Sequence, residues 1–305
     1  MKVLIVASFN KKRFAPFIVE QANALIEKGC EVEYFGIVGK GIKGYLKAYK
    51  GLVKKIKELK PDIIHAHYGL SGLLANLQRS VPVVTTYHGS DINLPKVLKL
   101  SKIAMRLSAV NIFVSQRNVD IAKPKKKFLL LPCGVNLPEY NEEDLIAIKK
   151  QSNWQESKKY ILFAGAFDNK VKNSPLAIES VKLLDNTELI ELKGYTREQV
   201  TALFYAVDAF LMTSFTEGSP QVVKEAMACG CPIVSVDVGD VSERIEGLSG
   251  CYIAERNPQD IADKLNKALS LNSRTKGCER IIELGLTNDL VANKLVDIYK
   301  GILNK

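Results

Sequence analysis

The chain has 305 residues, of which 47% are hydrophobic and 25% are charged, and its formal net charge at pH 7 is +10. This composition excludes a disordered chain, while the length exceeds one typical hydrophobic core and therefore predicts two domains. No apolar run approaches the roughly 20 residues that a membrane-spanning helix requires, and the first strand-length apolar run is not followed by a signal-peptide cleavage site.

The cysteines indicate the compartment. The six cysteines are scattered without a C-x-x-C pair, which is typical of a reducing environment, so we expect a cytoplasmic protein. Cys229 and Cys231 flank a glycine, but a zinc site there would need two further ligands in register. We therefore expect no metal at these cysteines.

Positive charge is concentrated in the first half. Residues 1–150 hold 25 Lys and Arg against 12 Asp and Glu, a balance of +13, whereas residues 151–305 hold 18 against 21, a balance of −3. Basic clusters lie at 11–13, 54–57 and 123–127. They fit an acceptor phosphate or an anionic membrane surface, although a solvated basic face needs no partner. We expect no nucleic-acid partner, because no known binding module accompanies the charge.

Apolar segments alternate with helical ones from the first residue, which predicts a parallel sheet with crossover helices. The sequence predicts strands at residues 2–8, 31–37, 62–68, 81–87, 111–116 and 128–135. It also predicts helices at 17–29, ending at Gly29, and at 45–60, ending before Pro61. The strands are almost continuously hydrophobic, as burial on both faces requires.

The same alternation restarts after a polar stretch at residues 141–159. We therefore predict an α/β fold of two doubly wound Rossmann-like domains, residues 1–150 and 151–305. The second set of strands is predicted at 160–167, 189–194, 209–215, 232–238 and 251–254, with helices at 176–184, 198–206 and 222–230. Three more helices, 259–271, 278–285 and 290–303, close the chain.

Doubly wound domains bind ligands at the carboxyl ends of their strands, and two of them in tandem would share a cleft. The first strand runs into VASFNKKRF and lacks the G-x-G-x-x-G motif of dinucleotide-binding enzymes. This departure disfavours a dehydrogenase.

The segment SFTEGSPQVVKEAMACGCPIVSVDVG, residues 214–239, predicts a short helix that starts at the carboxyl end of a strand. Ser219 suits the N-cap, Pro220 the first helical position and Gly230 the stop. The backbone N–H groups of residues 221–223 and the helix dipole would then stabilise a diphosphate.

Glu217 and Glu225 flank this helix start and could accept hydrogen bonds from sugar hydroxyls. Taken singly, each is better explained as an ordinary helix carboxylate. The acid and nucleophile of a glycosidase would have to face one bond, which a loop residue and a helix residue do not obviously do.

The spacing of Glu217 and Glu225, with seven residues between them, resembles the hallmark of glycosyltransferase family 4. The similarity extends through residues 192–214 and 160–181. It implies the GT-B architecture and a retaining transfer, with no metal or other cofactor, from a nucleotide diphosphate sugar. A UDP-sugar is the expected donor, and the second domain would bind it while the first domain binds the acceptor.

The resemblance also implies roles for single residues. Glu225 would bind the ribose hydroxyls and Glu217 the 3- and 4-hydroxyls of the sugar, while Lys172 would neutralise the diphosphate. Lys172 and Glu217 are thus candidate catalytic residues, together with His88. Further donor contacts are expected from Gly194, Tyr195, Gly218, Ser219, Pro220, Gln221 and Val222.

One position departs from the family. Ala166 follows Gly165 where the family usually has an arginine, and Lys170 could supply the missing charge but not the guanidinium fork. This change leaves open a non-catalytic member that binds a nucleotide or glycan within a polysaccharide assembly complex. No signature supports an epimerase or a phosphorylase.

In the first domain, His88-Gly89-Ser90-Asp91 resembles the histidine element of the family. His88 would bind the 6-hydroxyl of the donor sugar or place its backbone carbonyl at the anomeric centre. His65 and His67 alternate on one face of a strand and could join His88 around a metal, although strand-end histidines are more often bonded to neighbours.

Acceptor contacts are expected from Phe9, Asn10, Lys11 and Asp91. The expected acceptor is a glycan or a polyprenyl-phosphate-linked sugar in cell-surface polysaccharide biosynthesis. Its phosphate would contact the basic residues after the first strand, and the protein would then act at the inner face of the cell membrane.

Overall fold

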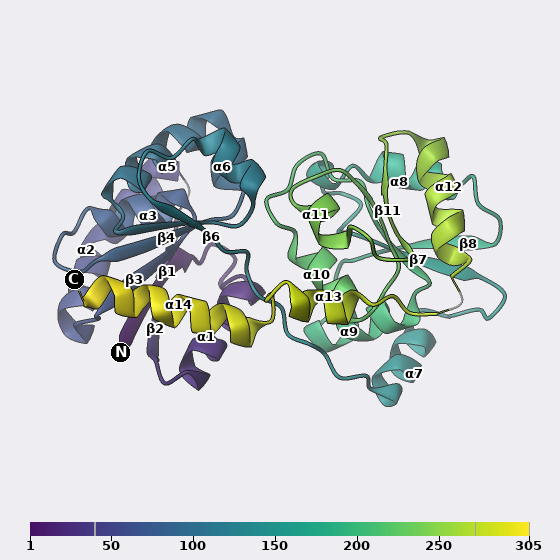
Figure 1. The fold of residues 1–305 in the computed structure, drawn as a ribbon, viewed down its shortest axis with the longest axis horizontal. Coiled ribbons are helices and arrows are strands. Elements are labelled where there is room, and N and C mark those ends of the chain that lie inside the picture. Colours follow the sequence, from purple (N-terminus) through teal and green to yellow (C-terminus); the bar gives the residue numbers. More distant parts are fainter. Residues whose placement is uncertain (40, 272, 305) are drawn as a thin grey trace. The chain divides into compact units, whose positions relative to one another are not determined.

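The computed structural model describes residues 1–39, 41–271 and 273–304. They form two compact units (Figure 1): unit 1 comprises Met1–Gly134 and the segment from Leu286 onward, and unit 2 comprises Val135–Gly285. No helix of these described ranges is long and apolar enough to cross a membrane.

Unit 1 contains a parallel sheet of six strands in the order β2-β1-β3-β4-β5-β6. The strands are β1 (Lys2–Ser8), β2 (Glu31–Ile37), β3 (Ile63–His67), β4 (Val83–Tyr87), β5 (Val110–Phe113) and β6 (Phe128–Leu130). All lie within the predicted segments, give or take a residue. The chain turns to opposite sides after β1 and after β3, so the switch point of this sheet lies between these two strands.

The helices of unit 1 cover the sheet. They are α1 (Pro16–Glu27), α2 (Gly41–Leu59), α3 (Gly69–Asn76), α4 (Ser90–Asn93), α5 (Pro95–Leu107), α6 (Gln116–Ala122) and α14 (Asn288–Leu303). Helices α3, α4, α5 and α6 were not predicted from the sequence. Of these, α3 is short and rich in small residues. Gly72 explains this composition, because a Cβ there would lie 2.5 Å from Thr85 Cγ2 of β4.

Unit 2 repeats the architecture with a parallel sheet in the order β11-β10-β9-β7-β8. Its strands are β7 (Lys159–Phe163), β8 (Thr187–Glu191), β9 (Ala209–Met212), β10 (Ile233–Val236) and β11 (Cys251–Ala254). Its helices are α7 (Glu142–Gln151), α8 (Ser174–Val181), α9 (Arg197–Ala206), α10 (Gln221–Ala228), α11 (Val241–Ile245), α12 (Pro258–Leu269) and α13 (Gly277–Glu283), with a short 3-10 turn η1 (Lys170–Lys172). The switch point lies between β7 and β9.

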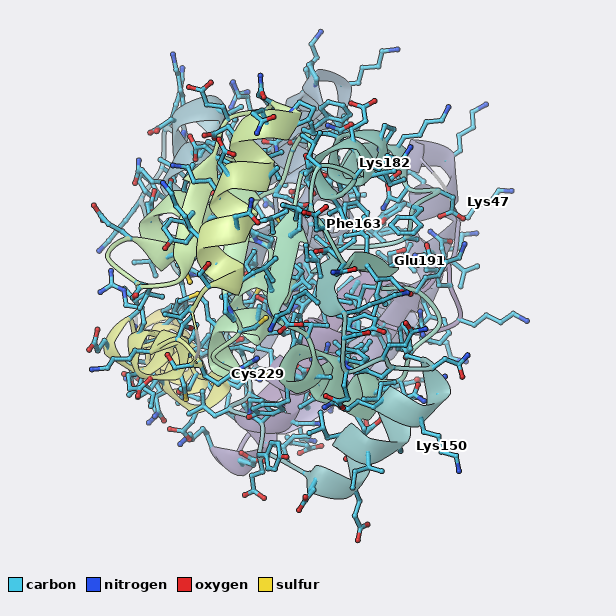
Figure 2. The ribbon with its side chains drawn as sticks, turned by 90° about the vertical axis from the view of Figure 1, so that its right-hand side faces the viewer. Lys47, Lys150, Phe163, Lys182, Glu191 and Cys229 are labelled. Atoms are coloured by element: carbon cyan, nitrogen blue, oxygen red, sulfur yellow. The ribbon has the colours of Figure 1, made fainter. Side chains whose placement is uncertain are left out.

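Side chains in unit 2 follow the layered arrangement. Phe163 of β7 is fully buried, whereas Lys150 of α7 and Lys182 after α8 extend from the surface (Figure 2). The α/β fold with two doubly wound domains is therefore confirmed.

The structure divides the chain at 134/135, where the sequence prediction placed the boundary at 150/151. The polar helix α7 belongs to unit 2, because Ile148 is buried there and Gln199 of α9 donates to Gln151 Oε1 at 3.0 Å. Helix α14 returns to unit 1 and packs Leu295 and Tyr299 into the core that contains Val3 of β1. Amphipathicity shows that such a helix needs a partner surface but does not identify which sheet supplies it.

Candidate functional site

The switch point of unit 2 brings Lys172 and Glu217 together. Lys172 ends the turn η1 after β7, Glu217 lies in the loop after β9, and the two strands are neighbours in the sheet. Lys172 Nζ lies 2.8 Å from Glu217 Oε1, and both side chains are only 18% exposed. The carboxyl edge of the sheet thus presents an ammonium group whose partner is a single, partly buried carboxylate.

Backbone hydrogen bonds hold the two loops against each other. The Thr213 hydroxyl lies 2.9 Å from the carbonyl oxygens of both Lys172 and Asn173, and the Phe215 N–H donates to the Val171 carbonyl at 2.9 Å. The position of Lys172 relative to Glu217 therefore follows from the backbone as well as from the ion pair.

Arg256 also stabilises the loop after β9. Its guanidinium donates to the carbonyls of Thr213 at 3.2 Å and Ser214 at 2.7 Å, and it stacks on the Phe215 ring at 5.6 Å. Arg256 lies directly after β11, about 40 residues along the chain, and sequence reasoning did not find it. No local signal could have found it, because the contact depends on how β11 and β9 are arranged in the sheet.

Glu225 lies in α10 with 15% of its side chain exposed, and its Oε1 accepts a hydrogen bond of 2.7 Å from Arg197. Arg197 begins α9, whose N-terminus is closed by a capping box of Thr196 and Gln199. Gly194, two residues before Thr196, has a φ of +84°, which strains any residue other than glycine. The strain comes from the backbone alone, because a Cβ there would meet no described atom within 4 Å. Tyr195 follows it, half-buried.

The start of α10 differs by one residue from the prediction. Pro220 is the N-cap, no side chain caps the helix, and Gln221 and Val222 form its first turn. Ser219 is therefore not the cap, and its buried Oγ has no hydrogen-bond partner among the residues described. Val223 N–H already donates to the Pro220 carbonyl at 3.2 Å, because the first turn is tight.

Gly230 ends α10 as predicted. It has a φ of +62°, and the Cys231 N–H returns to the Ala226 carbonyl at 2.9 Å. The helix is therefore bounded at both ends within the segment that the sequence singled out.

Gly218 is buried, and Gly239 packs beneath it. We expect Gly239→Ala to destabilise unit 2 more than the matched change Gly247→Ala. Both glycines have positive φ, +63° and +75°, so an L-residue costs about 1–2 kcal/mol at either position. A Cβ at Gly239 would lie 2.8 Å from the Gly218 carbonyl and 3.3 Å from Glu217 Cβ, whereas at Gly247 it meets nothing within 4 Å.

Urea unfolding and titration calorimetry with UDP would measure both effects. Gly239→Ala should also weaken UDP binding because it displaces Gly218, an expected donor contact before the start of α10. Equal losses in the two variants would show that the loop above Gly239 shifts at no cost.

Ala166 occupies the position at which the family usually has an arginine. Ala166 is half-buried in the loop after β7, and its carbonyl accepts the Asn169 N–H at 3.1 Å. Lys170 is exposed at the start of η1. Any charge that Lys170 supplies would come from a flexible ammonium group.

All three histidines of the chain meet in unit 1, at the carboxyl ends of β3 and β4. The His65 and His67 rings stack at 4.6 Å between centroids, and His67 Nδ1 lies 3.1 Å from His88 Nε2. His65 bonds to the Tyr299 hydroxyl through Nδ1 and to Thr86 Oγ1 through Nε2 at 2.8 Å. Burial lowers the pKa of His65 to about 3 and that of His67 well below its usual range, so both are neutral.

These contacts leave no open ligand set for a metal. Both nitrogens of His65 have protein partners, and His67 and His88 bond to each other. Within residues 1–39, 41–271 and 273–304, no group of three or more His, Cys, Asp or Glu side chains could hold a metal ion.

The proton between His67 and His88 can be assigned. His67 Nε2 is buried without a hydrogen-bond partner in the described part of the chain, and a buried N–H without an acceptor costs more than a buried lone pair. The His67 proton therefore resides on Nδ1 and is donated to His88 Nε2. His88 then carries its own proton on Nδ1, which faces Cys133 Sγ at 3.8 Å.

Asp91, which was predicted to contact the acceptor, is buried. It is only 3% exposed, and its carboxylate accepts the backbone N–H groups of Gly69 at 2.8 Å, His88 at 2.9 Å and Gly89 at 3.0 Å. Burial raises its pKa to about 6 despite these three donors. Asp91 thus fixes the turn that carries His88 and is not exposed to an acceptor, because the turn needs its oxygen atoms.

The loop after β1 lines a cavity of about 360 Å³ at the switch point of unit 1. Its polar wall includes Asn10, Lys11 and Arg13, and its apolar wall includes Phe14 and Tyr68. The side chain of Asn10 also accepts the Gly39 N–H at 2.7 Å. Phe9, in the same loop, is half-buried with its ring 4.9 Å from that of Phe14, and it does not line the cavity.

Comparison with known proteins assigns the family. The profile described as Glycosyltransferase Family 4 matches residues 30–138, and the profile Glycosyl transferases group 1 matches residues 180–270. TuaC of Bacillus subtilis, whose name assigns it to teichuronic acid biosynthesis as a glycosyltransferase, is 28% identical over 245 residues. The match covers 70% of this chain and 62% of TuaC. The amylovoran biosynthesis glycosyltransferase AmsK of Erwinia amylovora is 25% identical over 255 residues, 68% of this chain and 61% of its own length. The matched region therefore spans less than two thirds of these relatives.

Solved structures agree on the fold. The sucrose-phosphate synthase of Thermosynechococcus elongatus superposes with a TM-score of 0.82 at 15% identity, covering 100% of this chain and 99% of that one. HepE of Anabaena, solved in complex with UDP and glucose, superposes with a TM-score of 0.77 at 15% identity, covering 99% and 100%. By its two profile matches, the chain belongs to glycosyltransferase family 4, the glycosyl transferases of group 1.

Proposed function

We propose that the chain is a retaining glycosyltransferase that moves a sugar from a nucleotide diphosphate donor, a UDP-sugar, to a glycan or polyprenyl-phosphate-linked acceptor. The reaction would need no metal and no other cofactor. The observation that carries the proposal is the Lys172–Glu217 ion pair of 2.8 Å at the switch point of unit 2, next to the start of α10. The names of TuaC and AmsK support a place in polysaccharide biosynthesis.

The ion pair suggests how donor binding is coupled to sugar recognition. A diphosphate offers Lys172 more negative charge than one carboxylate does, so Lys172 turns from Glu217 to the phosphate when the donor binds. Glu217 is then released to accept hydrogen bonds from the 3- and 4-hydroxyls of the sugar. As the anomeric bond breaks, Lys172 stabilises the charge that develops on the leaving diphosphate.

Glu225 would bind the two ribose hydroxyls in a similar way. Its present partner Arg197 is 43% exposed and can move aside. Gly194, Tyr195 and the first turn of α10 supply the remaining donor contacts.

In unit 1, His88 would act through its backbone. Its Nε2 accepts a hydrogen bond from His67 Nδ1 and cannot donate to the 6-hydroxyl of the sugar, which favours the carbonyl as the group at the anomeric centre. The acceptor hydroxyl attacks from the side of the leaving group, and an oxygen of the donor phosphate takes its proton. The protein contributes positioning and charge stabilisation, without a covalent intermediate.

The acceptor would enter the cavity after β1. Lys11 and Arg13 would bind its phosphate, and Phe14 and Tyr68 would contact its apolar part. Such an acceptor resides at the inner face of the cell membrane, where we propose that the protein acts from the cytoplasm.

A thermal-shift series with UDP, GDP, ADP, CMP and their common sugars, with and without EDTA, tests the donor site. A nucleotide at 100 times its Kd should add about 2.7 kcal/mol of stability, a rise in Tm of several degrees. We expect the shift to be selective for UDP compounds, insensitive to EDTA and lost in Glu225→Ala. The matched control is Glu188→Ala, because Glu188 also forms an ion pair, with Lys158 at 3.0 Å, but near the amino ends of the strands.

A second candidate function, a non-catalytic nucleotide- or glycan-binding partner in an assembly complex, is favoured by Ala166. It predicts the same thermal shift but no release of sugar from the bound nucleotide sugar, with or without an acceptor. Absence of a shift with every nucleotide would overturn the donor site itself.

A further inference from the structure

Unit 1 carries a basic surface that the proposed reaction does not use. Residues 92–138 hold nine Lys and Arg but only one acidic residue, the exposed Asp120. This segment therefore carries more than half of the net positive charge of residues 1–138. Helices α5 and α6, which carry much of this charge, lie close together on unit 1 (Figure 1). We propose that this surface docks the protein on a membrane of anionic phospholipids.

The centre of the surface is a cavity of about 140 Å³ between α5 and the loop that joins α6 to β6. Five cationic side chains line it: Lys102, Arg106, Lys123, Lys125 and Lys126. Among the described residues, no carboxylate lines it. A cavity lined by one sign of charge suits the phosphate of a lipid headgroup.

The five side chains are exposed, and none of them forms an ion pair in the part of the chain that the structure describes. Elsewhere in unit 1, Lys2, Lys28 and Lys55 are each paired with a carboxylate. The unpaired cations repel one another unless an anion binds between them.

Helix ends explain only part of this cluster. Arg106 and Lys123 lie at the C-terminal ends of α5 and α6, where a cation is favourable. Each end carries only about half a negative charge, so two ends cannot balance five cations.

The surface is also distinct from the acceptor cavity. Arg106 precedes β5 and Lys126 precedes β6, so the surface lies at the amino ends of these strands. His88 follows β4 and therefore lies at the opposite edge of the same sheet. A ligand on the basic surface can remain bound while the reaction edge is in use.

Apolar side chains beside the cations favour a membrane over a free anion. Ile103 of α5 is 43% exposed, one helical turn from Lys99 and Arg106, and Ile121 of α6 is 41% exposed, one turn from Arg117. Lys96 and Lys99 extend the basic stripe along α5, beyond the cavity. An extended surface of cations and single apolar side chains suits a lipid interface, whereas a free phosphate would need only the cavity.

Vesicle flotation tests the proposal with the full chain. The probes are vesicles of phosphatidylcholine alone and of phosphatidylcholine with 30 mol% phosphatidylglycerol. We expect salt-sensitive binding to the anionic vesicles only. The fourfold variant Lys102→Glu, Arg106→Glu, Lys125→Glu and Lys126→Glu should lower the partition coefficient about 10²- to 10³-fold, since each basic residue near the membrane contributes about tenfold or less.

The matched control reverses four exposed lysines on α2: Lys43→Glu, Lys47→Glu, Lys50→Glu and Lys57→Glu. It changes the net charge equally and should keep most of the binding. An equal or larger loss in this control would overturn the proposal, and so would absence of wild-type binding to the anionic vesicles, whether or not the protein binds inorganic pyrophosphate. Ile103→Ser should weaken vesicle binding but leave pyrophosphate binding unchanged.

The docking surface rests on the proposed function in one respect: a lipid-linked acceptor explains why the protein would bind a membrane. UDP binding and Tm should be the same in wild type and fourfold variant, which also shows that the variant is folded. Loss of vesicle binding with intact UDP binding supports the docking surface, while absence of UDP binding in all forms counts against the proposed function alone.

Discussion

Replacing Lys172 with alanine is expected to lower kcat for sugar transfer about 10- to 150-fold, equivalent to about 1.5–3 kcal/mol for a charge-assisted contact. The loss should fall on kcat more than on KM, because the charge on the leaving diphosphate grows as the anomeric bond breaks. The variant also leaves Glu217, now 18% exposed, without its 2.8 Å partner, beside an incoming diphosphate of the same charge.

Steady-state kinetics with the nucleotide sugar identified by thermal shift would measure this effect. Lys158→Ala is the matched control, because it breaks a 3.0 Å ion pair with Glu188 on the same sheet near the amino ends of the strands. Glu217→Gln provides a second check, since it frees Lys172 and should leave diphosphate binding intact while weakening selection of the sugar. Unchanged kcat in Lys172→Ala would remove this residue from the reaction.

Acidification from pH 7 to pH 5 is expected to destabilise unit 1 through its buried histidines. Burial lowers the pKa of His65 from its ordinary 6.5 to about 3, and that of His67 also falls. Between pH 6.5 and pH 3 the unfolded chain binds protons that the folded chain does not, so stability falls as the pH falls. The loss at pH 5 is about 2 kcal/mol for each such histidine.

Asp91 acts in the opposite direction. Its pKa of about 6 lies above the ordinary 3.8, so between these values the folded chain binds the extra proton and stability rises as the pH falls. This gain is about 1 kcal/mol at pH 5, which leaves a net loss of about 2–3 kcal/mol.

Urea unfolding at pH 7 and pH 5 would measure the difference. The variant His65→Gln keeps an amide that can reach Tyr299 and Thr86 but does not titrate. We expect its pH dependence to be smaller than that of the wild type by about 2 kcal/mol. The chain has no histidine outside this cluster, so an unchanged pH dependence would mean that His65 is already protonated or solvated in the folded state.

The resemblance carried by the spacing of Glu217 and Glu225 identified the family, but it did not identify their partners. Lys172 lies within a predicted loop and Arg197 within a predicted helix boundary, and nothing local relates them to either glutamate. The sheet order β9-β7-β8 decides these contacts, because it places the loops after three strands along one edge. For Asp91 the prediction of an acceptor contact was wrong. Its carboxylate oxygens accept backbone N–H groups of the turn and of Gly69, and the side chain is buried.

The α/β class, the strands β1 to β11 of the described residues and the bounded helix α10 could be predicted, since they depend on periodicity and on caps that lie within a few residues of each other. Three other features could not be predicted: α14 packs on unit 1, His67 Nδ1 lies against His88 Nε2, and five cations surround one cavity. Each of these contacts joins segments that lie far apart along the chain. Which of many compatible surfaces meet is decided by the packing of the whole sheet, a non-local property that no short window of residues contains.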